Sequence, residues 1–237
     1  MSEFMGKNGF IWFVGVVEDR ADPKHLGRLK VRCLGYHTEN LDKLPTADLP
    51  WAHVMNPITS ATVSGVGQSP LGTVEGSWVV GFFQDGQDAQ MPVIIGTLPG
   101  IPDSLPDSES KKGFQDSVNA VYPKYKGETD VNRLAVADEN NPHSSLTIRK
   151  ADRTTDMGRA DFNEVQSFMS DIDNQTIAGD DGTSFSEPAV PYDATYPYNH
   201  VLESEGGHLR EFDDTPGAER IHERHSSGTG YEVHPDG

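Results

Sequence analysis

Residues 205–237 read Glu-Gly-Gly-His-Leu-Arg-Glu-Phe-Asp-Asp-Thr-Pro-Gly-Ala-Glu-Arg-Ile-His-Glu-Arg-His-Ser-Ser-Gly-Thr-Gly-Tyr-Glu-Val-His-Pro-Asp-Gly. Polar and apolar residues nearly alternate over 208–213, 218–225 and 230–235, and turn-forming residues separate these runs, which predicts three short strands. An isolated hairpin of this kind is marginal in water. The few apolar side chains cannot cover one sheet face and also bury each other, so we expect partner strands, most economically from other copies of the chain. These side chains are Leu209, Phe212, Ala218, Ile221, Tyr231 and Val233.

The first hundred residues carry the strongest strand patterns of the chain. Apolar or alternating runs cover 10–17, 27–34, 51–55, 77–83 and 92–97, with glycines at bends in the first, fourth and fifth runs. Five strands within about 90 residues suit a small closed barrel of the oligonucleotide/oligosaccharide-binding (OB) type. In the second run, alternation predicts that Leu29, Val31 and Cys33 face the core and that Lys30 and Arg32 face outward.

Residues 101–199 change character, because prolines recur and long apolar runs are absent. This composition predicts an extended linker. Two exceptions are a strand-like alternation over 145–149 and helical spacing of apolar residues over 159–172. We expect that helix to pack on the protein's own assembly rather than on a membrane, because acidic residues flank its apolar stripe. The predicted domains are therefore a barrel at 1–100, a linker at 101–199 and a C-terminal segment at 200–237.

The formal net charge of −18 bears on partners. Proteins that bind nucleic acid depend on clustered Lys and Arg, so we expect no nucleic acid partner for the chain as a whole. The single cysteine, Cys33, excludes an internal disulfide framework. No signal-peptide pattern and no run approaching the ~18 apolar residues of a membrane span is present. We therefore expect a soluble protein made in a cytoplasm.

Both ends of the chain contain stretches that resemble one family. The N-terminal stretches are 12–20, 26–32, 50–54, 57–60 and 93–97, and the C-terminal stretches are 196–199, 203–208, 212–221 and 225–229. Together they cover roughly half of the chain, and the chain resembles the central spike and baseplate hub proteins of contractile-tailed phages. These are relatives of the tail lysozyme of T-even phages and, more distantly, of type VI secretion spike proteins.

The resemblance implies a mainly β homotrimer in which C-terminal strands of three chains wind into an intertwined β-helix. The trimer seam is then expected to contain Leu209, Phe212, Ile221, Tyr231 and Val233. Implied partners are a trimeric baseplate hub protein, a possible spike-tip protein and, transiently, the host envelope. The implied location is the tail baseplate of the virion, after synthesis in the host cytoplasm. Three strands per chain only begin a β-helix, so we expect the needle to continue in another polypeptide.

The resemblance also bears on catalysis. Tail lysozymes of this group carry a muramidase domain with a Glu, an Asp nine residues later and a Thr six residues beyond. Here Glu164 and Asp173 have the first spacing by chance, Gly179 occupies the third position, and the middle region is too short for that domain. We expect no catalytic, cofactor or metal site and no cofactor. A tail-associated peptidoglycan hydrolase, or a module that recruits one, is the alternative function, and a nucleic-acid-binding OB module is a third class.

The histidines near the end of the chain give little support to a metal site. His222 and His225 lie three residues apart, which places them on opposite faces of a strand. The sequence also has no His-any-His pair, whereas some related spikes bind iron at their tip through such a pair.

Overall fold

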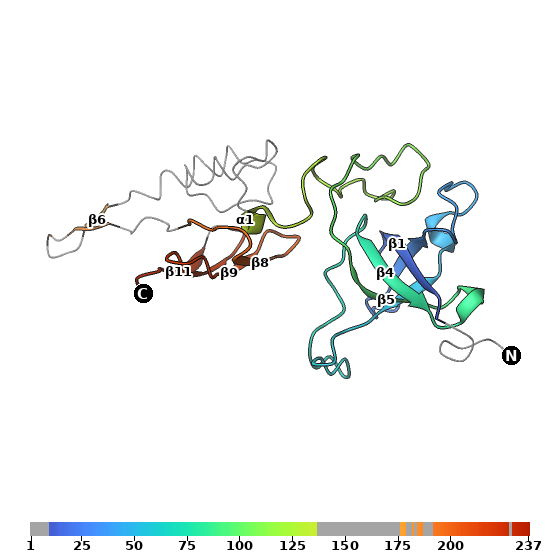
Figure 1. The fold of residues 1–237 in the computed structure, drawn as a ribbon, viewed down its shortest axis with the longest axis horizontal. Helices are drawn as coiled ribbons and strands as arrows, with labels where there is room; N and C mark the ends of the chain where they lie inside the picture. Colours follow the sequence, from blue (N-terminus) through green and yellow to red (C-terminus); the bar gives the residue numbers. More distant parts are fainter. Residues whose placement is uncertain (1–9, 137–175, 179–181, 183, 187–191, 228) are drawn as a thin grey trace. The chain divides into compact units, whose positions relative to one another are not determined.

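The computed structural model describes residues 10–136, 176–178, 182, 184–186, 192–227 and 229–237. The chain divides into two compact units, Met1–Gly127 and Glu128–Gly237 (Figure 1). Residues 101–127 therefore group with the barrel, although their composition predicted a linker. The boundaries at 100 and 199 stay a prediction. No helix among the described residues is long and apolar enough to cross a membrane.

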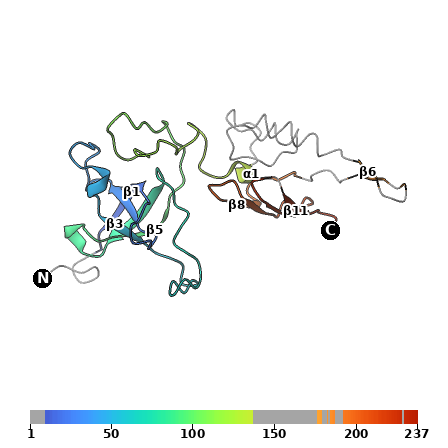
Figure 2. The same ribbon diagram turned by 180° about the vertical axis from the view of Figure 1, so that it is seen from behind.

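The first unit is built around a closed barrel with the strand order β1-β2-β3-β5-β4. Its strands are β1 (Trp12–Asp19), β2 (Leu29–Cys33), β3 (Trp51–Val54), β4 (Trp78–Phe83) and β5 (Pro92–Thr97). The pair β3 and β5 is parallel, and the other neighbours are antiparallel. Figure 2 labels β1, β3 and β5 in the barrel. This confirms the five-stranded barrel expected from the sequence. Short 3-10 turns lie at Thr46–Asp48 and Gly86–Asp88.

Alternate side chains of these strands fill the barrel. Its core includes Phe13, Val17, Leu29, Val31, Cys33, Ala52, Val79, Phe83 and Ile94. Gly81 sits where β4 shifts its register against β5. A Cβ at Gly81 would lie 2.1 Å from the carbonyl oxygen of Val93. Only glycine lets the two backbones approach this closely, so this residue helps to close the barrel.

Lys30 and Arg32, which the alternation predicts to face outward, are both buried, at 7% and 0% exposure. They do point away from the barrel core, but loops cover them. The guanidinium of Arg32 donates to Glu18 (Nε to Oε1, 2.6 Å) and to the carbonyl oxygens of residues 38 and 44. The backbone amide of Phe114 donates to the same Glu18 oxygen at 2.8 Å. This ion pair thus holds two covering segments against β1 and β2.

The second unit contains a four-stranded antiparallel sheet with the order β11-β10-β9-β8. Its strands are β8 (Asn199–Glu203), β9 (Leu209–Asp213), β10 (Arg220–Arg224) and β11 (Gly230–Val233), and one turn of helix, α1 (Arg133–Val136), contacts β8. The last three strands confirm the three predicted runs, whereas β8 was not predicted. A two-stranded pair, β6 (Thr176–Ala178) and β7 (Ser184–Ser186), lies in the region predicted as linker. The predicted strand at 145–149 and helix at 159–172 lie outside the described residues.

Candidate functional site

The two faces of the C-terminal sheet differ sharply in chemistry. On one face, Glu211 lies opposite His222, which lies opposite Glu232, and the adjacent row contains Asn199, Asp213 and Arg220. We name this the charged face. On the other face, Phe212 lies opposite Ile221, which lies opposite Val233. We name this the open face, and it also carries Leu202 and Tyr231.

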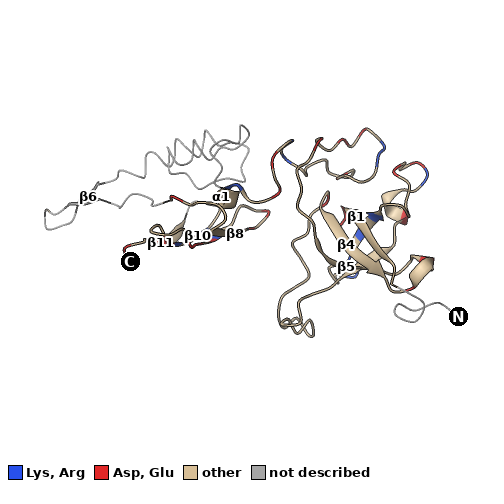
Figure 3. Ribbon diagram, viewed as in Figure 1, with Lys and Arg blue, Asp and Glu red and all other residues tan. Residues whose placement is uncertain are grey.

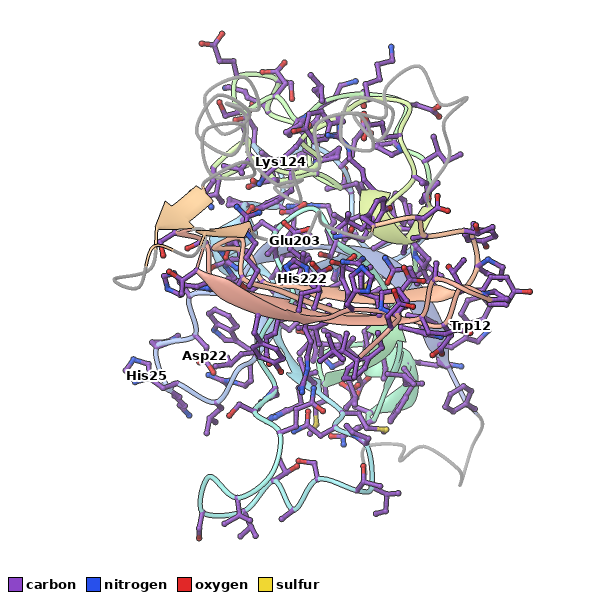
Figure 4. The ribbon with its side chains drawn as sticks, turned by 90° about the vertical axis from the view of Figure 1, so that its left-hand side faces the viewer. Trp12, Asp22, His25, Lys124, Glu203 and His222 are labelled. Atoms are coloured by element: carbon purple, nitrogen blue, oxygen red, sulfur yellow. The ribbon has the colours of Figure 1, made fainter. Side chains whose placement is uncertain are left out.

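The charged face is organised around the carboxylate of Glu211, which is fully buried. It accepts hydrogen bonds from Arg220 (Nη2 to Oε1, 2.8 Å) and Asn199 (Nδ2 to Oε1, 2.9 Å). Nδ1 of His222, a residue labelled in Figure 4, lies 2.7 Å from the other oxygen of Glu211, Oε2. Nη1 of Arg220 also reaches Glu232, at 2.8 Å. Buried charges are tolerated only when they are paired and hydrogen-bonded in this way.

The network shifts the ionisation of Glu211. Burial by itself would raise the pKa of this carboxyl, but the hydrogen bond from His222, the charge of Arg220 and the hydrogen bond from Asn199 outweigh it. Together they lower the pKa from 4.5 to about 2. Glu211 is therefore ionised at neutral pH, where it balances the buried guanidinium of Arg220.

The chain itself covers the charged face. Leu134 of α1 is 1% exposed and packs against Leu209, Tyr192 and Val201. The hydroxyl of Tyr192 donates to the carbonyl oxygen of Leu134 at 2.9 Å, and its ring stacks 5.0 Å from the guanidinium carbon of Arg220. The side chain of Asn132 caps α1 by accepting from the amide of Leu134 at 2.9 Å. Segments outside the sheet, around Leu134 and Tyr192, therefore cover the charged face.

The open face has no such cover within the described residues. Its apolar side chains remain exposed, from 38% for Ile221 and 42% for Phe212 to 54% for Tyr231 and 68% for Leu202. Phe212, Ile221 and Val233 also line a shallow hollow of about 310 Å³, together with the charged residues Asp213, Asp214, Glu219 and Arg220. In the neighbouring row of this face, Arg210 and Glu223 separate Leu202 from Tyr231, so the uninterrupted apolar part is the row of Phe212, Ile221 and Val233. Exposed apolar surface marks an interaction site.

The structure brings together four of the five residues predicted for a trimer seam. Phe212, Ile221, Tyr231 and Val233 share the open face. Leu209 lies on the charged face and is 6% exposed, because it is separated from Phe212 by an odd number of positions on the same strand. Leu209 therefore belongs to the core of this unit rather than to the open face.

His222 and His225 were expected on opposite faces of one strand, but β10 ends at Arg224, before His225. His222 lies in the charged face, whereas His225 stacks on His208 at the turn end of the sheet, with ring centroids 4.5 Å apart. Within the described part of the chain, no three potential metal ligands converge. Sequence reasoning missed the network of Glu211, Arg220 and His222. Its signal was present in the sequence, as acidic residues alternating along one run and basic residues along the next.

Comparison with known proteins identifies the family. Residues 36–176 match the Gp5 N-terminal OB domain. The chain is 40% identical over 264 aligned positions, covering 99% of its length, to Protein Gp5 of Vibrio phage KVP40. It is also 40% identical over 149 positions to the pre-baseplate central spike protein Gp5 of Enterobacteria phage T4. The chain spans 58% of the length of the first relative and 25% of the second. By its closed barrel and these matches, the chain belongs to the family of proteins with a Gp5 N-terminal OB domain.

Proposed function

We propose that this chain is a structural component of a contractile phage tail baseplate, the trimeric central spike that links the hub to the cell-envelope-piercing needle. One observation carries the proposal. Among the described residues, the chain covers the charged face of its C-terminal sheet with its own segments and leaves the apolar row of the open face exposed. A free chain would expose this surface to water at a cost of roughly 25 cal/mol per Å².

Three copies offer a direct way to cover the open faces. Each sheet ends in two edge strands, β8 and β11. Unpaired edges invite pairing with another chain, so three sheets can share a continuous hydrogen-bond ladder around a common apolar seam. Such a three-chain β-shaft is stiff, and stiffness is what a needle driven by sheath contraction requires. Phe212, Ile221, Tyr231 and Val233 line the seam in this assembly.

The relatives support the same role. The T4 protein is named for its place in the central spike of the pre-baseplate, and that name supports a non-enzymatic role and a location in the tail baseplate of the virion. In this role the chain assembles as a homotrimer, contacts a hub protein trimer, and meets a separate tip protein and the host envelope at its other end. Its charge of −18 keeps it soluble and discourages adhesion to anionic envelope surfaces.

The native mass of the full chain tests the proposal. Mass photometry or sedimentation at micromolar concentration should give three times the chain mass of 25.9 kDa. A monomer under these conditions would contradict the spike assignment. A zymogram on peptidoglycan should show no clearing, and a cleared zone would instead favour a tail-associated hydrolase.

A further inference from the structure

The loop between β3 and β4 is unusual for this chain. Residues 55–74 contain no Asp, Glu, Lys or Arg, although charged residues make up 24% of the whole sequence. The loop nevertheless lies in water, and its apolar side chains are among the most exposed of the described residues. Ile58 is 101% exposed, Leu71 76%, Val63 63% and Val66 62%. Figure 3 shows this loop free of charged residues along its course below the barrel. We name residues 55–74 the docking loop.

Hydrogen bonds within the docking loop fix its shape. The side-chain amide of Asn56 donates to the carbonyl oxygen of Gln68 at 2.9 Å. The backbone amide of Gln68 donates to the hydroxyl of Ser60 at 2.7 Å. At the tip, Val63 and Val66 form an isolated antiparallel bridge. These contacts constrain the backbone of the loop, so less ordering entropy is lost when a partner binds it.

The same unit carries a second uncharged surface, on the outer side of β1, β4 and β5. Residues 10–17, 78–83 and 92–97 contain no charged side chain. Trp12 is 59% exposed, Phe10 56%, Ile95 49% and Trp78 41%. We name Phe10, Trp12, Trp78 and Ile95 the aromatic barrel face. The third tryptophan, Trp51, is different, because the cations of Arg28 and Lys30 lie over its ring at 5.4 and 5.0 Å.

We propose that the docking loop of one copy packs on the aromatic barrel face of a second copy. Two copies that each carry a charge of −18 repel each other, and screening is incomplete within about 8 Å at physiological salt. Contact between copies is therefore least costly where both surfaces lack charge, and the loop and the face meet this condition. Because they are different surfaces of one chain, the contact is head-to-tail, and in a closed trimer three such contacts form a ring. The inference rests on the proposed trimer and adds a contact between its barrels.

Cysteine cross-linking of the full chain tests this contact. Cys33 is fully buried, and burial raises the pKa of its thiol to about 12, so it does not compete for a maleimide reagent. The variant Val63→Cys/Ile95→Cys, treated with a short bismaleimide, should give covalent dimers and trimers on a denaturing gel. Each single variant should give neither. The control Val63→Cys/Lys43→Cys, which places the second thiol on an exposed loop residue, should also give neither.

The outcomes separate the two proposals. A native trimer without covalent dimers or trimers in the Val63→Cys/Ile95→Cys variant would overturn the loop contact and leave the C-terminal seam standing. A monomeric native mass would overturn the trimer and the loop contact together.

A second readout uses tryptophan fluorescence, because Trp12 and Trp78 become covered in the contact. In the Val63→Asp variant, acrylamide quenching should rise severalfold over the unchanged chain at unchanged native mass, since the accessible tryptophans increase from Trp51 alone to all three. Equal acrylamide quenching in the Val63→Asp variant and in the unchanged chain would count against the contact between the docking loop and the aromatic barrel face.

Discussion

Phe212 and Ile221 lie directly opposite each other on β9 and β10, and both side chains remain exposed, at 42% and 38%. Their sequence neighbours Glu211 and Arg220 form an ion pair of 2.8 Å with both side chains fully buried. Among the described residues, the second unit therefore buries an ion pair on one face and exposes an apolar row, beside Arg210 and Glu223, on the other. Folded proteins in water usually expose charged side chains and bury large apolar ones, and the trimer that we propose covers this row with apolar surface from other copies.

The first prediction concerns the centre of the open face. Ile221→Asp places a charge where the proposed trimer has apolar contacts, and burying an uncompensated carboxylate is strongly unfavourable. We expect the assembled state to weaken by about 3 kcal/mol or more, which corresponds to over a hundredfold in the dissociation constant. Mass photometry across a dilution series should show dissociation at concentrations where the unchanged chain is trimeric.

The control for this prediction is Leu26→Asp, which changes an exposed leucine of the barrel unit, 53% exposed. It should leave the native mass unchanged. Circular dichroism should show an intact barrel in both variants. If Ile221→Asp remained trimeric at every concentration tested, the open face would not be the seam.

The second prediction separates Leu209 from the open face. Because Leu209 packs on Leu134 in the core of the second unit, Leu209→Ala and Leu134→Ala should each lower the free energy of unfolding by about 2–4 kcal/mol. The two losses should not add, because contacting residues share their energy. Unfolding in urea, followed for both single variants and the double variant, gives the coupling. If the loss in the double variant equalled the sum of the two single losses, Leu209 and Leu134 would not be in contact.

Sequence periodicity predicted much of this fold for identifiable reasons. The barrel strands carry long apolar or alternating runs, so β1 to β5 could be placed from the sequence. β9 to β11 could be placed because Gly, Pro, Ser and Asp separate them. β8 was not predicted because the residues at its two ends, Asn199 and Glu203, are polar although they face inward. They form hydrogen bonds with residues of a distant segment, Leu134 and Asn132.

The errors have one physical origin. Alternation shows which side of a strand a residue occupies, but it does not show what covers that side. Arg32 does point away from the barrel core, yet segments near residues 40 and 114 fold over it. Leu209 was expected in the trimer seam, but its register places it on the same face of the sheet as Glu211. Long-range covering contacts of this kind leave no local periodic signal.

The third prediction concerns the buried pair of Glu18 and Arg32. Arg32→Leu leaves the Glu18 carboxylate buried without its partner, which should destabilise the barrel by about 3–5 kcal/mol. The double variant Glu18→Leu/Arg32→Leu removes both charges and should recover much of this loss. Thermal unfolding measures both effects, and hydrogen exchange at Gly113 and Phe114 should quicken in the single variant, because that segment is tied to Glu18.

A matched exposed pair provides the control. Lys111 and Asp42 join nearby segments at 3.1 Å, but both side chains are more than half exposed. Lys111→Leu should change stability by less than about 1 kcal/mol. Equal losses for Lys111→Leu and Arg32→Leu would show that burial does not set the strength of the Glu18 pair.

The last prediction follows from the lowered pKa of Glu211. A carboxyl whose pKa falls from 4.5 when unfolded to about 2 when folded stabilises the folded state above pH 4.5. This contribution is lost as pH falls from about 4.5 to about 2, and it amounts to on the order of 3 kcal/mol. Urea unfolding of the full chain at several pH values should show this loss. Glu211→Gln should be less stable at pH 7 and show a shallower decline in acid, whereas Glu39→Gln, at an exposed position, should follow the unchanged chain. If Glu211→Gln declined as steeply as the unchanged chain, other carboxylates would account for the acid sensitivity, and the network around Glu211 would not hold it ionised.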